Sequence, residues 1–198
     1  MVRLSLGCGS PVAYADLAPG EVVVDLGSGA GLEVLRAARA VGPHGQAVGV
    51  DMTEEMVVLA RHNAAALGVP NARFVVGDLE TLPLPDHFAD AVISNCVVNL
   101  VPDKAQAFRE AHRVLRPGGR LVVSDVMADR SLPPELKDDP QAWSACVAGA
   151  LSLEEYLRLV REAGFQAVEV LEESRADCGD PWRVSLRSVT LRARKPLG

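Results

Sequence analysis

The stretch that decides the fold reads Val22-Val23-Val24-Asp25-Leu26-Gly27-Ser28-Gly29-Ala30-Gly31. Its first half is a short apolar run that ends at a glycine, which predicts a fully buried strand. Apolar residues recur with helical spacing from Leu32 until Gly42-Pro43, so the glycine-rich half joins a strand to a helix. Glycines at such a junction let the backbone turn sharply and approach a ligand closely. We therefore predict a ligand-binding loop at the carboxyl end of a buried strand.

Strand-like and helix-like segments alternate along the rest of the chain. We expect further strands at residues 46–51, 72–77, 88–94, 120–126, 166–171 and 184–193, and helices that begin after Thr53, at Pro102-Asp103 and after Ser152. A turn at Pro117-Gly118-Gly119 is expected to separate the second of these helices from the next strand. The alternation is typical of an α/β fold, a doubly wound and mostly parallel sheet that helices cover on both faces. The last strand alternates apolar and polar residues, which favours an antiparallel strand at the edge of the sheet.

The composition fits one globular domain and excludes several classes of protein. The chain has 198 residues, of which 48% are hydrophobic, and this is enough to bury a substantial core. Its 20 Lys and Arg against 26 Asp and Glu give a net charge of −6, which argues against a protein built to grip nucleic acid. The sequence shows no long basic run, no apolar stretch of membrane-spanning length and no secretory signal. We expect a cytoplasmic protein with neither a nucleic-acid nor a membrane partner.

An acidic residue stands about twenty positions beyond the glycine loop, at the spacing that nucleotide-binding sheets use. Asp51 follows the second strand, where its carboxylate can accept hydrogen bonds from both hydroxyls of a ribose. A dinucleotide would use a GxGxxG spacing, whereas the spacing here is GxGxG with Asp25 just before it. The Asp25 carboxylate would repel a pyrophosphate but suits an ammonium group. The pattern therefore favours S-adenosylmethionine, which has an amino acid at one end and an adenosine at the other.

A second turn predicts the adenine end of that cofactor site. Gly77-Asp78-Leu79-Glu80 follows the third strand. The Asp78 carboxylate can accept a hydrogen bond from the exocyclic amine of adenine, while Met52 and Leu79 can enclose the ring. An ordinary solvated turn is the alternative for this piece taken alone.

Four features together resemble those of the class I S-adenosylmethionine-dependent methyltransferases: the glycine loop, Asp51, the Gly77-Asp78 turn and the Arg116-Pro117-Gly118-Gly119 turn. The resemblance covers most of the chain and implies a single methyltransferase domain over residues 1–198. It also implies a Rossmann-like, seven-stranded sheet with one antiparallel strand, and a cofactor at the carboxyl ends of the strands. The cofactor-binding residues that we expect are Asp25, Gly27, Ser28, Gly29, Gly31, Asp51, Met52, Asp78, Leu79 and Asn95.

More specific motifs resemble those of the arsenite methyltransferases. They are Gly7-Cys8-Gly9, Asp51-Met52-Thr53, Ile93-Ser94-Asn95-Cys96-Val97, Asn99-Leu100, Pro102-Asp103-Lys104, Ser124-Asp125-Val126, Cys146-Val147-Ala148-Gly149-Ala150-Leu151 and Ser188-Val189-Thr190-Leu191-Arg192-Ala193. The resemblance implies that Cys8, Cys96 and Cys146 bind trivalent arsenic and that Asn95 contacts the cofactor. It further implies arsenite or methylarsenite as the substrate, and glutathione or thioredoxin as a thiol reductant. Members of this family usually carry helical sequence before the first motif, where this sequence has six residues.

The chemistry of the cysteines agrees with this resemblance. The four cysteines, which include Cys178, form no CxxC pair, so a zinc site is not expected and free thiols are expected in a reducing cytosol. Arsenite is soft and thiophilic, so thiolates are its natural ligands. The arsenic lone pair carries no proton, so an attack on a methyl group requires no general base. Small buried thiols of the core are the alternative, and we expect an incidental loop thiol at Cys178.

The segment at about residues 127–151 is irregular, with Pro133-Pro134, Pro140 and small apolar residues around Trp143. A long insertion between sheet elements is more often a lid or a binding segment than an inert loop, so we expect it to bind the substrate. Two other functions stay open at this point. One is a methyltransferase for a small organic acceptor such as a quinone precursor, and the other is a non-catalytic arsenical-binding protein.

Overall fold

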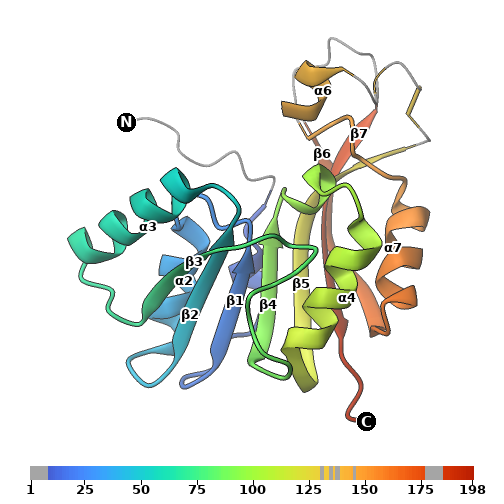
Figure 1. Cartoon of the computed structure of the whole chain (residues 1–198). Helices are drawn as coiled ribbons and strands as arrows, with labels where there is room; N and C mark the ends of the chain where they lie inside the picture. Colours follow the sequence, from blue (N-terminus) through green and yellow to red (C-terminus); the bar gives the residue numbers. More distant parts are fainter. Residues whose placement is uncertain (1–8, 130–131, 134–135, 137–138, 145, 177–184) are drawn as a thin grey trace.

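The computed structural model describes residues 9–129, 132–133, 136, 139–144, 146–176 and 185–198. A seven-stranded sheet runs through the molecule in the order β3-β2-β1-β4-β5-β7-β6 (Figure 1). The strands are β1 (Val22–Leu26), β2 (Gln46–Asp51), β3 (Ala72–Val76), β4 (Ala89–Asn95), β5 (Leu115–Ala128), β6 (Gln166–Arg175) and β7 (Leu186–Arg194). The helices are α1 (Pro11–Tyr14), α2 (Leu32–Val41), α3 (Glu54–Ala66), α4 (Lys104–Val114), α6 (Pro140–Ser144), α7 (Leu153–Glu162) and the 3-10 helix η1 (Val98–Leu100).

The direction of the strands confirms the expected sheet with one antiparallel strand. From β3 to β5 each strand pairs in parallel with its neighbour. β7 is antiparallel both to β5 and to β6. The strand order reverses between β1 and β4, and ligands bind at such a switch point, outside the carboxyl ends of the strands.

Helices cover both faces of the sheet because successive side chains of a strand point to opposite faces. Val24 of β1 belongs to a core cluster with Phe108 of α4 and Tyr156 of α7. Its neighbour Val23 belongs to a second cluster with Val34 of α2 and with residues of α3. The layers on the two faces are therefore α1–α3 and α4 with α7 (Figure 1).

The structure shows side-chain capping at the start of two of the helices expected from the sequence. The helix expected after Ser152 is α7, and Ser152 and Glu155 form a capping box at its start. Asp103 caps α4, because its carboxylate accepts a hydrogen bond from the backbone N–H of Gln106 at 2.9 Å. Thr53 precedes α3 as expected, but its side chain makes no capping bond. These starts depend on a few neighbouring residues, which is why sequence reasoning finds them.

The predicted edge position of the last strand is wrong. β7 lies between β5 and β6, and β6 forms the edge beyond it. Val189, Thr190 and Leu191 of β7 are buried, whereas most residues of β6 are exposed. Alternation along a strand indicates which face is covered, but it does not say whether the backbone has a neighbour on one side or on both.

The predicted turn at Pro117-Gly118-Gly119 is not a separate turn. β5 begins at Leu115, directly after α4, and Leu115 pairs with Ala89 of β4. The register of that pairing shifts between Ala89 and Ala91, and Gly118 has a φ of +79°. The two glycines therefore allow an irregularity inside a long strand, and their local signal is the same as that of a turn.

Candidate active site

The glycine loop follows the carboxyl end of β1, as predicted, and it therefore lies at the switch point between β1 and β4. The backbone N–H groups of Gly27 and Ser28 both donate to the carbonyl of Val50 in β2, at 2.8 and 3.0 Å. Gly27 has a φ of +67°, and a Cβ there would lie within 2.8 Å of the Val97 side chain. Gly29 also has a positive φ, of +50°, but a Cβ there would meet nothing within 4 Å. Packing therefore requires the glycine at position 27, whereas the backbone at Gly29 borders open space that a ligand can fill.

Gly31 closes the loop against the other face of the sheet. It has a φ of +90°, and a Cβ there would lie 2.8 Å from the Phe74 ring of β3. The side chain of Asn63 in α3 donates a hydrogen bond to the carbonyl of Ala30 at 3.0 Å. Asn63 was not predicted to take part, because its partner is distant in sequence and the contact leaves no local signal.

Asp51 joins two loops at the carboxyl edge of the sheet. Its Oδ2 accepts a hydrogen bond from the N–H of Gly29 at 2.8 Å, and its Oδ1 accepts one from the N–H of Thr53 at 2.9 Å. The predicted acid after the second strand thus faces the predicted glycine loop. The structure brings these two parts of the expected cofactor site together.

Three carboxylates surround the loop. Asp25 is only 3% exposed and Glu33, at the start of α2, is 7% exposed. Burial raises the pKa of Asp25 well above its ordinary range, and the negative charges of Glu33 and Asp51 raise that pKa further. Arg36 neutralises part of this charge through its ion pair with Glu33 at 2.7 Å. A cationic ligand beside Asp25 would stabilise its ionised form, as an ammonium group would.

Glu33 is a residue that sequence reasoning missed. In sequence it is an ordinary acid in the first turn of α2, where acids are common. In the fold it lies beside the N-terminal segment, since its Oε2 accepts a hydrogen bond from the N–H of Val12 at 3.4 Å. Only the packing of α1 against α2 turns it into a buried charge of the site.

The adenine end of the expected site is only partly assembled. Met52 is 75% exposed, so its side chain is free to cover a ligand. Asp78 is exposed, and its Oδ1 accepts a hydrogen bond from the N–H of Glu80 at 2.8 Å. Leu79, in contrast, is buried in the core cluster that includes Phe108 of α4 and Tyr156 of α7. The structure therefore leaves Met52 and Asp78 facing solvent, but it does not place the Leu79 side chain opposite Met52.

Asn95 ends β4 and holds the backbone of Gly9. Its side chain donates to the carbonyl of Gly9 at 2.7 Å and accepts from the N–H of Gly9 at 3.3 Å. Gly9 also packs on β5, because a Cβ there would lie 2.8 Å from the Ser124 side chain. Cys8 precedes Gly9 in the sequence but lies outside the described residues, as does Cys178.

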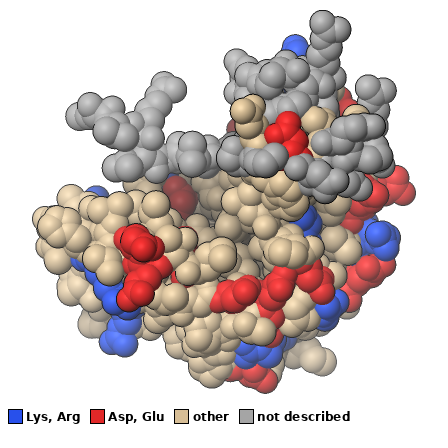
Figure 2. Space-filling view, turned by 45° about the horizontal axis from the view of Figure 1, so that its top comes forward, with Lys and Arg blue, Asp and Glu red and all other residues tan. Residues whose placement is uncertain are grey.

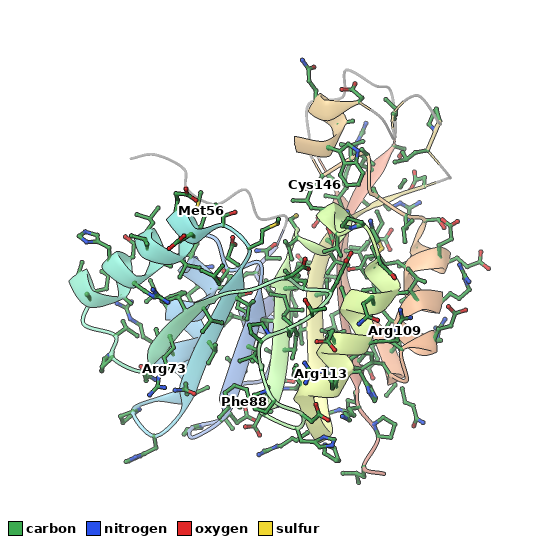
Figure 3. The ribbon with its side chains drawn as sticks, in the orientation of Figure 1. Met56, Arg73, Phe88, Arg109, Arg113 and Cys146 are labelled. Carbon is green, nitrogen blue, oxygen red and sulfur yellow. The ribbon has the colours of Figure 1, made fainter. Side chains whose placement is uncertain are left out.

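Cys96 and Cys146 meet at this edge although they are 50 residues apart. The Sγ of Cys146 donates to the backbone carbonyl of Cys96 at 3.3 Å. Both residues have a φ of +59°, which is uncommon for a residue with a side chain and is often found at functional sites. Figure 3 shows Cys146 above the carboxyl end of the sheet, and Phe88 and Arg113 at the opposite end.

The redox states of the two cysteines differ. Cys146 forms no disulfide bond, whereas Cys96 is in one. The expectation of cysteines outside disulfides is therefore right for Cys146 and wrong for Cys96. Within the described residues, no cluster of three His, Cys, Asp or Glu side chains has the geometry of a metal site. The proposed third arsenic ligand, Cys8, is not among those residues.

The surface of the described part of the molecule agrees with its negative net charge. Acidic side chains gather in several patches on the face that Figure 2 turns toward the viewer.

Comparison with known proteins places this chain in a family. Residues 17–164 match the family described as "Methyltransferase domain". An arsenite methyltransferase of Halobacterium salinarum is 46% identical over 201 residues, which cover 98% of this chain and 51% of that protein. An arsenite methyltransferase of Aquipseudomonas alcaligenes is 42% identical over 174 residues, which cover 84% of this chain and 50% of that protein. This chain thus spans about half the length of these curated relatives.

A solved structure is similar over nearly the whole chain. It is that of an arsenic(III) S-adenosylmethionine methyltransferase from Chlamydomonas reinhardtii. The two structures superpose with a TM-score of 0.86 at 37% sequence identity, and the match covers 97% of this chain and 68% of that one. The chain therefore belongs to the arsenite S-adenosylmethionine methyltransferase family.

Proposed function

We propose that this protein transfers a methyl group from S-adenosylmethionine to trivalent arsenic, which it binds as arsenite or methylarsenite through Cys8, Cys96 and Cys146. The observation that carries the proposal is the contact between the Cys146 thiol and the backbone of Cys96 at 3.3 Å. Two cysteine residues so distant in sequence meet beside the open glycine loop, in a chain whose relatives are arsenite methyltransferases.

The residues around the loop fit S-adenosylmethionine, which supplies an electrophilic methyl group on a positively charged sulfur. Its ammonium group suits the buried carboxylates of Asp25 and Glu33, which lack a full set of counter-charges in the described structure. The backbone at Gly29 borders open space, so the cofactor can approach the loop closely there. We expect Asp51 to hold the ribose and Asp78 the adenine amine, with Met52 over the ring.

The cysteines would bind the substrate and exclude water from it. Each thiol that replaces a hydroxide on arsenic releases its proton to that hydroxide, and one water molecule leaves. Cys96 is 5% exposed and packs with Cys146 in an apolar cluster, so arsenic held there is shielded on one side. The lone pair of arsenic is the nucleophile and carries no proton, so the chain's contribution is orientation of the substrate.

The disulfide at Cys96 supports a reductant as a partner. A sulfur in a disulfide cannot ligate arsenic as a thiolate, so Cys96 must be reduced first. We propose glutathione or thioredoxin for this step. Both belong to a cytoplasmic setting, which is our proposal for the location of the protein. Of the helices that the structure describes, none combines the length and the apolar character that a membrane span requires.

We propose one methyltransferase domain over residues 1–198, with the segment at about 127–151 as its substrate-binding insertion. β5 leads into this segment, and the N–H of Ala128 donates to the carbonyl of Leu151 at 2.9 Å. This bond closes the insertion at its base. Cys146 lies inside it and packs with Val126, Ala142 and Val147.

The test is direct. Reduced protein is incubated with S-adenosylmethionine, glutathione and arsenite, and methylated arsenicals are separated by chromatography. We expect product from the wild type and from Cys178→Ser, and none above background from Cys96→Ser or Cys146→Ser. Turnover of S-adenosylmethionine without arsenite that tolerates Cys146→Ser would instead indicate a small organic acceptor. Stoichiometric arsenite binding with no cofactor binding in calorimetry would indicate an arsenical-binding protein.

A further inference from the structure

Asn99 lies between the two segments that carry the proposed arsenic ligands Cys96 and Cys146. It lies in η1, three residues after Cys96, and its side chain is fully buried. Its Nδ2 donates to the carbonyl of Val126 at 2.6 Å and to the carbonyl of Cys146 at 3.4 Å. One carboxamide thus contacts β5 and the backbone of a proposed ligand.

The segment of residues 146–151, here called the Cys146 segment, presses on Asn99 from the other side. A Cβ at Gly149 would lie 1.8 Å from the carbonyl oxygen of Asn99, so only glycine allows this approach. Side-chain and backbone atoms of Asn99 therefore both face the Cys146 segment. The sequence alone does not link the motif Asn99-Leu100 to the motif Cys146 to Leu151. In the structure the two motifs are in contact.

A buried carboxylate holds Asn99 in turn. The Oδ2 of Asp125 accepts a hydrogen bond from the N–H of Asn99 at 3.2 Å and one from the Tyr156 hydroxyl at 3.3 Å. Its Oδ1 accepts one from the N–H of Val126 at 2.9 Å. Since Tyr156 comes from α7, the network links η1, β5 and α7 beneath the two cysteines.

Retaining this carboxamide has a cost to stability. The Oδ1 of Asn99 is buried and has no hydrogen-bond partner among the described residues. A buried polar atom without a partner destabilises a fold, so a purely structural position favours an apolar side chain. The donor half of the carboxamide, which binds the Cys146 carbonyl, is the part that the fold uses.

We propose that Asn99 is a positioning residue, which fixes the Cys146 segment against the end of β4 and thereby sets the geometry in which Cys96 and Cys146 bind arsenic together. This inference rests on the proposed function, because it assumes that the two thiols share one arsenic atom. Asn99 acts through the backbone of Cys146, to whose carbonyl its side chain donates a hydrogen bond.

The test uses phenylarsine oxide, a trivalent arsenical that binds two thiols. Two As–S bonds form, and the oxide leaves with the two thiol protons as water. The protein carries Cys8→Ser and Cys178→Ser, so that Cys96 and Cys146 are its only thiols, and it is reduced with a phosphine beforehand. The measured quantities are the dissociation constants of phenylarsine oxide and, by calorimetry, of S-adenosylmethionine.

We expect Asn99→Ala to weaken phenylarsine oxide binding about fivefold to tenfold, which corresponds to the loss of one hydrogen bond. The dissociation constant of S-adenosylmethionine is expected to stay unchanged, since the hydrogen bonds of Asn99 go to Asp125, Val126 and Cys146 and not to the glycine loop. In the methyl-transfer assay of the otherwise wild-type protein, the KM for arsenite rises while the KM for S-adenosylmethionine does not.

Asn71→Ala is the matched control. Its side chain also donates to backbone carbonyls, those of Ala38 at 2.8 Å and Gly42 at 2.9 Å, but at the amino end of the sheet. Asn71→Ala removes comparable hydrogen bonds and should leave the dissociation constants of phenylarsine oxide and S-adenosylmethionine unchanged. Gly149→Ala disturbs the same contact from the other side, so it must reproduce the effect of Asn99→Ala even if that variant fails to fold.

Two results would overturn the inference. One is phenylarsine oxide binding that stays at the wild-type level in Asn99→Ala and in Gly149→Ala. The other is an equal loss of S-adenosylmethionine and phenylarsine oxide affinity, which indicates general disruption. Failure of the proposed function looks different: the wild type yields no methylated arsenic, while phenylarsine oxide binding still depends on Asn99.

Discussion

The buried carboxyl of Asp125 makes the stability of this fold depend on pH in a way that can be calculated. Burial raises the pKa of Asp125 from its ordinary value of 3.8 to about 7. Hydrogen bonds from Val126, Tyr156 and Asn99 and the charge of Lys104 act in the opposite direction but do not compensate for the burial. At neutral pH about half of the folded molecules therefore hold a proton on this side chain.

The sign and size of the effect follow from linkage. Between pH 4 and pH 7 the folded chain keeps a proton that the unfolded chain has lost, so stability falls as the pH rises. The free energy of unfolding falls by about 1.4 kcal/mol per pH unit in that window, or about 2.5 kcal/mol between pH 5 and pH 7. Above about pH 8 both states are ionised and the slope of this contribution vanishes.

Asp125→Asn removes this contribution because an amide does not ionise. Urea unfolding of the wild type and the variant at pH 5, 6, 7 and 8 gives the difference in their free energies of unfolding. We expect the wild type to lose about 2.5 kcal/mol relative to the variant between pH 5 and pH 7, and little more by pH 8.

Asp129→Asn is the matched control for this experiment. The pKa of Asp129 lies below its ordinary value because of a hydrogen bond with Ser185 and the nearby Arg187, so both of its states are ionised above pH 5. Its difference from the wild type should not change over the window. A difference between the wild type and Asp125→Asn that is constant from pH 5 to pH 8, or that grows in favour of the wild type, would refute the reasoning.

Three further predictions concern the glycine loop and the core. Gly27→Ala should lower the free energy of unfolding by about 1–3 kcal/mol, since its methyl group overlaps Val97, and should weaken S-adenosylmethionine binding; an unchanged urea midpoint would contradict this. Asp51→Asn should weaken S-adenosylmethionine binding about tenfold in calorimetry, because a backbone N–H and a ribose hydroxyl lose an acceptor, and wild-type affinity would argue against the assigned role. Arg120→Met leaves the Glu21 carboxylate half-buried without its partner and should cost about 3 kcal/mol in urea unfolding, with cofactor affinity retained.

Two substitutions isolate the causes in those predictions. Gly68→Ala keeps a positive φ, of +63°, but its methyl group meets nothing within 4 Å, so it measures backbone strain without a clash. Arg158→Met breaks an exposed ion pair with Glu162, which should cost at most about 0.5 kcal/mol. If Gly68→Ala costs as much stability as Gly27→Ala, overlap with Val97 is not the cause of the loss. If Arg158→Met costs as much as Arg120→Met, burial of the ion pair is not the cause.

Much of the fold follows from local patterns in this sequence. The apolar run before Gly27 and the helical spacing from Leu32 predict β1 and α2 with their observed ends. The capping box at Ser152 marks the start of α7. Long-range pairing is different: the place of β7 inside the sheet, and the path of residues 117–119 within β5, depend on partners that lie far away in the chain.

The residues of the candidate site also fall into those that local sequence predicts and those that only packing brings together. The glycine loop and Asp51 are recognisable from residue type and spacing, because each element of the loop serves the turn or the ligand directly. Glu33, Asn63 and Asn99 carry no such signal. They join the site because packing buries them beside residues that are remote in sequence.

The sequence by itself determined the class of fold, the nucleotide-type loop and the identity of the candidate thiols, since these depend on periodicity and on residue chemistry. Only the tertiary structure decided that Cys96 and Cys146 meet, that Leu79 belongs to the core and that Asp125 loses its contact with water. The physical reason is that proximity and desolvation are properties of the packed chain. A hydrogen bond across 50 residues and a pKa of about 7 come into existence only when the strands and helices close over them.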